Sequence, residues 1–192
     1  MKPVAFYFDY ASPWAYLANE LLNRRLPGIA VTYHPIYLRG LETFSKGLPY
    51  TGAKLAYLMR DIARCAAHEA VTLAVPAVFP IDGLTALRAA FVAQDSGAFD
   101  RFHRAAFRAG WQEQRDISTK EVVARILADA LGSSEAIALE AMTTPAIKER
   151  LRTITAKAEA RGVFGTPTFF VGDEMFWGHD RFDYVAREAI KP

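Results

Sequence analysis

The stretch FYFDYASPWAYL, residues 6–17, decides the fold expected for this chain. Its first half is typical of a strand covered on both faces, because Val4, Phe6 and Phe8 alternate with residues that are themselves largely apolar. Its second half is typical of a helix, since Ser12 is a good N-cap and Pro13 fits the first helical position. Ser12 is therefore expected at a strand-to-helix turn, beneath the free N–H groups and the positive dipole end of a helix.

Two interpretations of Ser12 follow from this position. The first is a simple helix cap, which is the commoner role when only the local sequence is considered. The second is a binding role, because helix N-termini at such turns hold anionic ligands or a reactive sulfur. The C-terminal part of the chain, described below, favours the second interpretation.

Composition excludes several classes of protein. The chain has 192 residues, of which 52% are hydrophobic, so it can fill a proper core. Its net charge of +2 comes from scattered basic residues, without the basic stripe that nucleic-acid binding needs. The apolar runs are too short to span a bilayer, and Met1 leads directly into the first strand without an apolar leader. We therefore expect a cytoplasmic protein that binds neither nucleic acid nor membrane.

Cysteine and histidine usage limits the chemistry. Cys65 is the only cysteine, so an intrachain disulfide, a Cys-x-x-Cys redox pair and a cysteine zinc cluster are all impossible. We expect Cys65 to be a small buried residue of a helix. The four histidines show no metal-ligand spacing, and no metal site is predicted.

The order of elements predicts an α/β, thioredoxin-like fold. Strands are expected at 4–8 and 29–33 around a helix at 13–26, and a hairpin is expected at 168–171 and 174–177 before a last helix at 181–190. Between them the pattern is helical, at 53–69, 84–94, 99–109, 118–131, 133–142 and 145–162, with an extended connection at 75–83. The 118–131 helix is expected to open with a capping box at Ser118. Removing the helical block leaves the order βαβαββα, which is the order of elements in thioredoxin. We predict one domain over 1–192, with a thioredoxin-like part at about 1–44 and 145–192 and a large all-helical insertion at about 45–144.

Two C-terminal motifs match the Ser12 turn. Pro167 opens a strand, a position where proline is tolerated, and in the thioredoxin architecture this proline is cis and faces the first helix. Thr166 would then offer its backbone N–H and C=O to an extended peptide. A strand-start proline without a role is the alternative.

His179 and Asp180 either cap the last helix or bind a ligand. In the binding interpretation, Asp180 holds an ammonium group while the helix N-terminus takes a carboxylate. Glutathione carries such an amino-acid end, a peptide backbone for Thr166 and a thiol for Ser12, so one ligand satisfies all three features.

Two segments of the chain resemble a known enzyme family. Residues 6–17 and 163–181, the latter reading VFGTPTFFVGDEMFWGHDR, strongly resemble 2-hydroxychromene-2-carboxylate isomerases. These enzymes are relatives of kappa-class glutathione transferases and of the DsbA disulfide oxidoreductases. The resemblance covers essentially the whole chain, and it includes Tyr57–Asp61 and Leu87–Ala90 in the helical block.

The resemblance implies a glutathione site. Ser12 occupies the position of the first cysteine of the Cys-Pro-x-Cys motif of DsbA and Ala15 that of the second, so dithiol chemistry is lost and the sulfur comes from glutathione. Ser12 would donate a hydrogen bond to this sulfur and, with the helix dipole, favour the thiolate. The other residues that the resemblance assigns to glutathione are Thr166, Pro167, Trp177, His179 and Asp180. Relatives are often dimers, which implies a homodimer here.

The resemblance also implies a reaction. The glutathione thiolate adds reversibly to an unsaturated carbon, the former double bond rotates, and expulsion of the thiolate gives the isomer. This interconverts 2-hydroxychromene-2-carboxylate and trans-o-hydroxybenzylidenepyruvate in the degradation of aromatic hydrocarbons.

The sequence departs from the family where the aromatic substrate binds. Family members carry a lysine and an asparagine-arginine pair at positions that correspond to Glu42 and to Leu48-Pro49. Positive charge for a substrate carboxylate could come instead from Arg39, Arg60 or Arg88. For each of these arginines, a surface or structural salt bridge is the ordinary alternative.

Three functions therefore compete. The leading hypothesis is a glutathione-dependent isomerase. The second is a kappa-like glutathione transferase or peroxidase acting on other electrophiles, which would consume glutathione. The third is a non-catalytic thioredoxin-fold binding module, for which Ser12→Ala would cause no loss of function.

Overall fold

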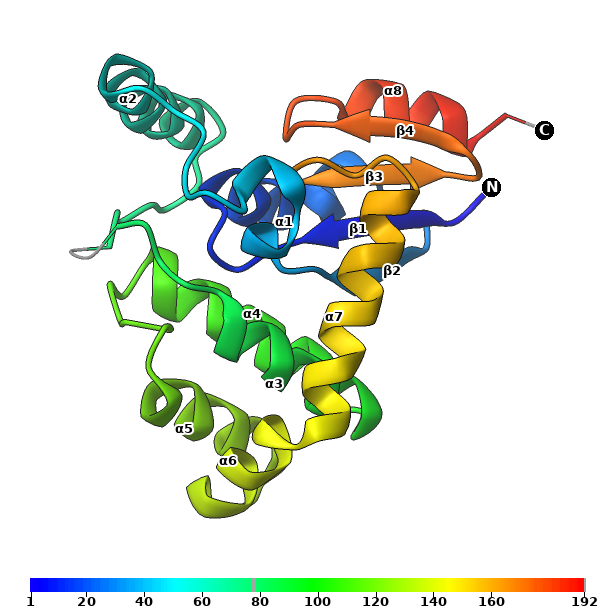
Figure 1. Ribbon diagram of the computed structural model, residues 1–192. Coiled ribbons are helices and arrows are strands. Elements are labelled where there is room, and N and C mark those ends of the chain that lie inside the picture. Colours follow the sequence, from blue (N-terminus) through cyan, green and yellow to red (C-terminus); the bar gives the residue numbers. More distant parts are fainter. Residues whose placement is uncertain (77–78, 192) are drawn as a thin grey trace.

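A four-stranded sheet in the order β2-β1-β3-β4 forms the centre of the fold (Figure 1). The computed structural model describes residues 1–76 and 79–191. Its strands are β1 (Val4–Phe8), β2 (Val31–Pro35), β3 (Thr168–Val171) and β4 (Glu174–Trp177). β1 pairs with β2 in parallel and with β3 antiparallel, and β3 and β4 form an antiparallel hairpin. This order confirms the predicted thioredoxin-like fold.

Helices surround this sheet on both sides and extend well beyond it. They are α1 (Pro13–Arg25), α2 (Gly52–His68), α3 (Leu84–Asp95), α4 (Phe99–Trp111), α5 (Lys120–Leu131), α6 (Glu135–Thr143), α7 (Pro145–Ala160) and α8 (Phe182–Ala189). Helices α3 to α6 lie together at one end, and α7 runs from them back along the sheet (Figure 1). Helix α2 stands apart beside α1, and only Ile62 and Ala66 of α2 are buried.

Both faces of β1 are covered, as its sequence predicts. Phe6 and Phe8 belong to the main core, in which Phe6 stacks on Phe169 of β3 with ring centroids 5.2 Å apart. Tyr7 points to the opposite face and joins a smaller cluster with Phe170 of β3 and Ala158 of α7. Burial of apolar side chains on both faces stabilises the central position of β1 in the sheet.

The structure corrects several expected boundaries. β2 begins two residues later than predicted and ends at Pro35. Helix α5 begins at Lys120 with Thr119 as its N-cap, and no side chain caps it. The expected capping box is absent because the Ser118 hydroxyl accepts a hydrogen bond from the backbone N–H of Asp82 instead. Residues 77 and 78 of the expected extended connection lie outside the described residues.

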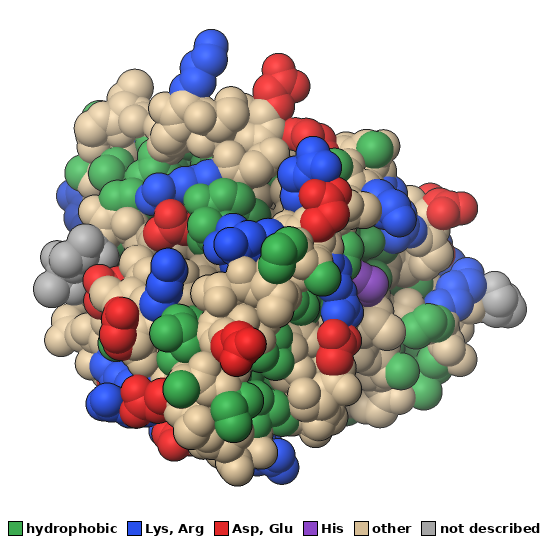
Figure 2. All heavy atoms as spheres, turned by 60° about the horizontal axis from the view of Figure 1, so that its bottom comes forward, with side chains coloured by type: hydrophobic (Ala, Val, Ile, Leu, Met, Phe, Trp, Pro, Cys, Tyr) green, Lys and Arg blue, Asp and Glu red, His purple; other side chains and the backbone are tan. Residues whose placement is uncertain are grey.

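The surface carries mixed charge. Figure 2 shows basic and acidic side chains interspersed on the face at the bottom of Figure 1, in keeping with the scattered charges of the sequence. Within residues 1–76 and 79–191, the helices are all too short or too polar to cross a membrane. Cys65 lies half-buried on α2, so it is more accessible than the sequence predicts.

Candidate active site

Ser12 forms the N-cap of α1 and is almost completely buried. Its backbone is extended, and its Oγ accepts a hydrogen bond from the N–H of Ala15 at 3.1 Å. Its hydroxyl donates to the backbone carbonyl of Thr166, also at 3.1 Å, across the interior of the fold. The Ser12 side chain is therefore both a helix cap and a bridge to the C-terminal half of the chain.

The peptide that faces Ser12 has the predicted conformation. The Thr166–Pro167 bond is cis, and β3 begins at the next residue, so the expectation of a cis proline at the start of this strand is confirmed. The Thr166 Oγ1 atom is buried and has no hydrogen-bond partner among the described residues. The carbonyl of Pro167 accepts from the N–H of Gly178 at 3.0 Å, which joins this peptide to the turn after β4.

The turn after β4 brings His179 to the same helix end. The His179 ring stacks on Trp14 of α1, with centroids 4.7 Å apart. Trp177 is half-exposed and contacts Phe164, with ring centroids 5.1 Å apart. Ser12, Thr166, Pro167 and His179 are thus gathered around the start of α1, whereas Trp177 lies on β4 beside Phe164 and Gly165.

Both carboxylates and a guanidinium, that of Arg181, lie near His179 on this side of the site. Asp180 forms an ion pair with Arg181 at 3.3 Å, and both side chains are about half-exposed. Burial lowers the pKa of His179, while the nearby carboxylates of Asp180, Asp61 and Glu69 act to raise this pKa. The last helix has Arg181 at its N-cap position without a side-chain hydrogen bond, so the expected cap by His179-Asp180 is wrong.

The three candidate arginines are not brought together. Arg39, in the turn Leu38–Gly40, forms an ion pair with Asp82 at 3.4 Å. Arg60 is exposed on α2, and Arg88 lies on α3 with a buried Nε that has no partner in the described part of the chain. No hydrogen bond or ion pair among the described residues links Arg60 or Arg88 to Ser12.

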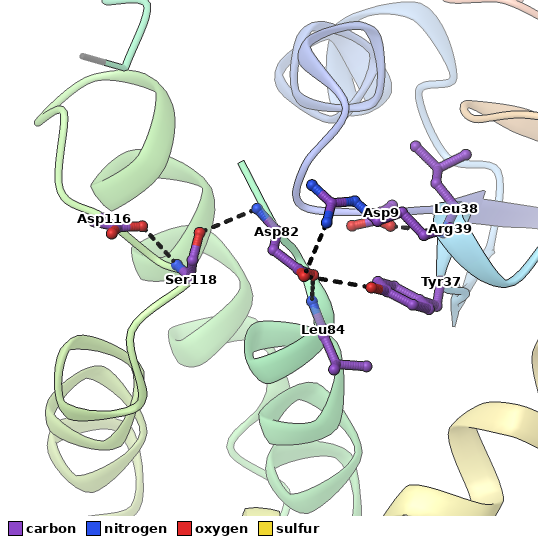
Figure 3. A network of polar contacts seen from close by, with 8 residues as sticks. All are labelled: Asp9, Tyr37, Leu38, Arg39, Asp82, Leu84, Asp116 and Ser118. Carbon is purple, nitrogen blue, oxygen red and sulfur yellow. Dashed lines mark hydrogen bonds and ion pairs between the residues drawn. The ribbon is translucent and has the colours of Figure 1, made fainter. Parts of the chain in front are cut away.

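The sequence did not predict the polar network that Asp9 and Asp82 form beside Ser12. Asp9 directly follows β1 and is fully buried, with its carboxylate turned toward the segment that carries Leu38 and Arg39 (Figure 3). Asp82 faces the same segment and accepts hydrogen bonds from Tyr37 and from the N–H of Leu84. A buried carboxylate is energetically costly unless it is hydrogen-bonded. An aspartate at the end of an otherwise apolar strand was therefore the sequence feature that could have indicated this network.

The loop that departs from the isomerase pattern encloses a shallow hollow. This hollow has a volume of about 320 Å³ and is lined by Glu42, Lys46, Leu48 and Pro49 among others. The backbone N–H of Glu42 is tied to Glu159 of α7 by a hydrogen bond of 2.6 Å. Ser12 does not line this hollow, so the hollow and the Ser12 turn are separate features of the surface.

Comparisons with known proteins agree with this architecture. Residues 3–189 match the family described as the DSBA-like thioredoxin domain. The chain is 30% identical to a 2-hydroxychromene-2-carboxylate isomerase of Sphingobium xenophagum over 96% of both chains. It is 31% identical to a protein of the same name from Pseudomonas putida, over 93% of this chain and 89% of that one.

Solved structures give the same picture. A 2-hydroxychromene-2-carboxylate isomerase superposes with a TM-score of 0.82 at 27% identity, over 96% of this chain and 92% of that one. A probable DsbA oxidoreductase from Streptomyces coelicolor has a TM-score of 0.77 at 16% identity, over 98% of this chain and 88% of that one, and shows the shared fold.

Proposed function

We propose that this chain, which belongs to the 2-hydroxychromene-2-carboxylate isomerases within the family of DSBA-like thioredoxin domains, interconverts 2-hydroxychromene-2-carboxylate and trans-o-hydroxybenzylidenepyruvate with the help of glutathione. The observation that carries the proposal is the placement of the Ser12 hydroxyl, buried at the N-terminus of α1 against the cis peptide Thr166–Pro167. A dithiol reaction is excluded, because Cys65 is the only cysteine of the chain.

The residues around α1 fit glutathione. The start of α1 offers free N–H groups and a positive dipole end, which favour a thiolate over a thiol. Thr166 presents peptide groups and a buried hydroxyl that has no partner in the described part of the chain, and such a group suits a ligand that brings further polar atoms. Asp180 and Asp61 supply negative charge near His179, which suits the ammonium end of the γ-glutamyl arm. When bound, glutathione supplies a nucleophilic thiolate that adds reversibly to the substrate and so frees its double bond to rotate.

Ser12 and Thr166 can exchange partners. In this structure the Ser12 hydroxyl donates a hydrogen bond to the Thr166 carbonyl at 3.1 Å. We infer that the hydroxyl turns to donate to the sulfur while the carbonyl accepts an amide N–H of the ligand. The hydroxyl oxygen keeps its hydrogen bond from Ala15, so the side chain stays oriented. Its burial excludes water, which strengthens the interaction of the hydroxyl with a negative sulfur.

Arg39 is the arginine best placed to meet the substrate carboxylate. It is linked through Leu38 to the Asp9 network beside Ser12, and its side chain is 46% exposed. Its present partner is Asp82, an ion pair weak enough to be replaced because both side chains are partly solvated. No hydrogen bond or ion pair within residues 1–76 and 79–191 gives Arg60 or Arg88 such a link.

One assay tests the proposal. The ultraviolet spectrum of 2-hydroxychromene-2-carboxylate is followed with and without glutathione, for the wild type, Ser12→Ala and Ser134→Ala. Ser134 is a matched control, because its Oγ caps α6 by accepting from Ile137 just as Ser12 caps α1. We expect conversion that requires glutathione, falls roughly 100-fold or more in Ser12→Ala, and is unchanged in Ser134→Ala. Conversion without glutathione, or full activity in Ser12→Ala, would contradict the proposal.

The loop around Glu42 favours a second candidate. It places an acidic residue and Leu48-Pro49 where a carboxylate-binding set is expected, and it lines its own hollow. A kappa-like glutathione transferase or peroxidase with another electrophile fits this difference. Consumption of glutathione, without isomerisation of the chromene, would support the second candidate. The expectations of a homodimer and of a cytoplasmic location stay predictions, which sedimentation and cell fractionation would test.

A further inference from the structure

The carboxylate of Asp9 is built into the turn that carries Ser12. Its Oδ1 accepts from the N–H of Ala11 at 2.9 Å, and its Oδ2 accepts from the N–H of Leu38 at 2.8 Å. The backbone carbonyl of Asp9 accepts from the N–H of Ser12 at 3.0 Å. Asp9 itself is fully buried and cannot touch a substrate. One side chain therefore closes the β1–α1 turn and fastens it to the segment after β2.

The start of α3 presses against the same carboxylate. Gly83 lies directly before α3, and a methyl group added there would overlap Asp9 Oδ1 and come within 3.2 Å of the N–H nitrogen of Ala11. The backbone of Gly83 thus approaches too closely for any side chain. Three segments that are distant in sequence meet at Asp9, and each limits where its carboxylate can lie.

We propose that Asp9 is the positioning residue for Ser12, which sets the place of the Ser12 hydroxyl by holding the β1–α1 turn against Leu38 and Gly83. The inference rests on the proposed function for its catalytic consequence, since the hydroxyl that it positions is the one assigned to the sulfur. The N–H groups of Ala11 and Leu38 donate to different oxygens of Asp9, so an amide in the same position would present an oxygen to one of them and an NH₂ group to the other. Displacement of a reacting group by about 1 Å can cost a factor of 100 in rate.

The charged neighbours of Asp9 make its protonation state measurable. Burial raises the pKa of Asp9 to about 7, although the hydrogen bonds from Ala11 and Leu38 lower this pKa. Asp82 raises the pKa further and Arg39 lowers it. The charge of Asp9 also acts to raise the pKa values of Tyr10 and Tyr37, whose hydroxyls are hydrogen-bonded to His103 and Asp82. Titration of Asp9 near neutral pH should therefore appear in the amide signals of the turn that it holds.

The first experiment needs neither glutathione nor substrate. Amide resonances of Ala11, Ser12 and Leu38 are followed by NMR from pH 5 to pH 9 in the wild type, Asp9→Asn and Thr155→Val. Thr155 is the matched control, because its Oγ1 accepts from the N–H of Tyr37 and so holds the same segment from α7 without touching the Ser12 turn. We expect one shared midpoint in the wild type and in Thr155→Val, and its loss in Asp9→Asn. A Ser12 amide that keeps its position and titration in Asp9→Asn would overturn the proposal.

The second experiment asks whether the effect on catalysis passes through Ser12. In the isomerase assay with glutathione we expect Asp9→Asn to lower kcat roughly tenfold or more, with the KM for glutathione within about twofold of wild type. In a Ser12→Ala background, Asp9→Asn should cause less than about a twofold further loss, because the positioned hydroxyl is already absent. Gly83→Ala, which leaves Asp9 chemically intact but displaces its carboxylate, should reproduce the loss of kcat.

The two experiments separate the possible failures. Equal losses from Asp9→Asn in the wild-type and Ser12→Ala backgrounds would mean that Asp9 acts on the fold alone, and the positioning role would be rejected. A wild type without isomerase activity but with the shared NMR midpoint would reject the proposed function and uphold the control of the Ser12 turn by Asp9.

Discussion

Replacement of Asp9 by asparagine should change how the stability of the protein depends on pH. The carboxyl is completely buried, and burial raises its pKa from an ordinary value of 3.8 to about 7. This shift of about 3 pKa units corresponds to about 4 kcal/mol, since each unit is worth about 1.4 kcal/mol. This free energy is the amount by which burial disfavours the charged form of Asp9 relative to its neutral form.

The sign of the effect follows from proton binding. The folded protein binds the Asp9 proton more tightly than the unfolded chain, so folding stability falls as pH rises from about 4 to about 7. Asparagine cannot ionise, but it leaves one of two backbone N–H groups without an acceptor, at a cost of about 1–3 kcal/mol at every pH. We therefore expect the wild type to be more stable than Asp9→Asn at pH 4, and Asp9→Asn to be the more stable protein at pH 8.

Urea unfolding at half-unit intervals from pH 4 to pH 8 would measure this crossing. The informative quantity is the difference in unfolding free energy between the two proteins, because most other titrating groups cancel in it. Thr155→Val is a suitable control, since Thr155 holds the neighbouring segment through the N–H of Tyr37 and its side chain cannot ionise. A constant difference for Asp9→Asn, or a wild type that gains on the variant as pH rises, would refute the reasoning.

Three further predictions concern other contacts. Burial lowers the pKa of His103 from 6.5 to about 3, so its contribution to folding stability should be full above pH 6.5 and be lost as the pH falls toward 3. In acid unfolding experiments, His103→Gln should avoid up to about 5 kcal/mol of this loss, and equal losses in both proteins would contradict the prediction. Trp111 donates from Nε1 to the carbonyl of Tyr10 at 2.8 Å, and Trp111→Phe should lower the unfolding free energy by about 1–3 kcal/mol in urea, whereas an unchanged midpoint would count against the bond. Gly165→Ala places a methyl group 3.0 Å from Trp177 Nε1, so the KM for glutathione should rise several-fold with kcat retained, and an unaltered KM would exclude Trp177 from the glutathione site.

The fold could be predicted because its signals are local. Ser12 and Pro13 mark the start of α1, the Gly172-Asp173 turn marks the hairpin, and the strand order follows from where helices separate strands. The helix caps were less predictable, because a capping side chain can find another partner in the folded protein. The Ser118 hydroxyl accepts from the N–H of Asp82 in this way, so α5 begins later than its capping-box sequence indicates.

The candidate site was only partly predictable. Ser12, Thr166 and His179 were recognised because thioredoxin topology brings their motifs to one helix end, and the structure places them there. The role of Asp9 was missed because it depends on Leu38 and Gly83, whose approach no local pattern reveals. Likewise, nothing in the sequence distinguished Arg39 from Arg60, although in the described residues Arg39 is joined to the Ser12 turn through Leu38 and Arg60 is not.

Because β1 pairs with β3, the site around Ser12 can form only late in the synthesis of the chain. Tyr7 pairs with Thr168, so a ribosome that adds 5–20 residues per second needs roughly 10–30 s to produce the partner of β1. Helices α3 to α6 depend mostly on contacts with one another and can form during this interval. A nascent chain that stops before residue 166 has neither the antiparallel neighbour of β1 nor the carbonyl that faces Ser12. Chains that end before residue 166 should therefore be inactive, however well their helices α3 to α6 have formed.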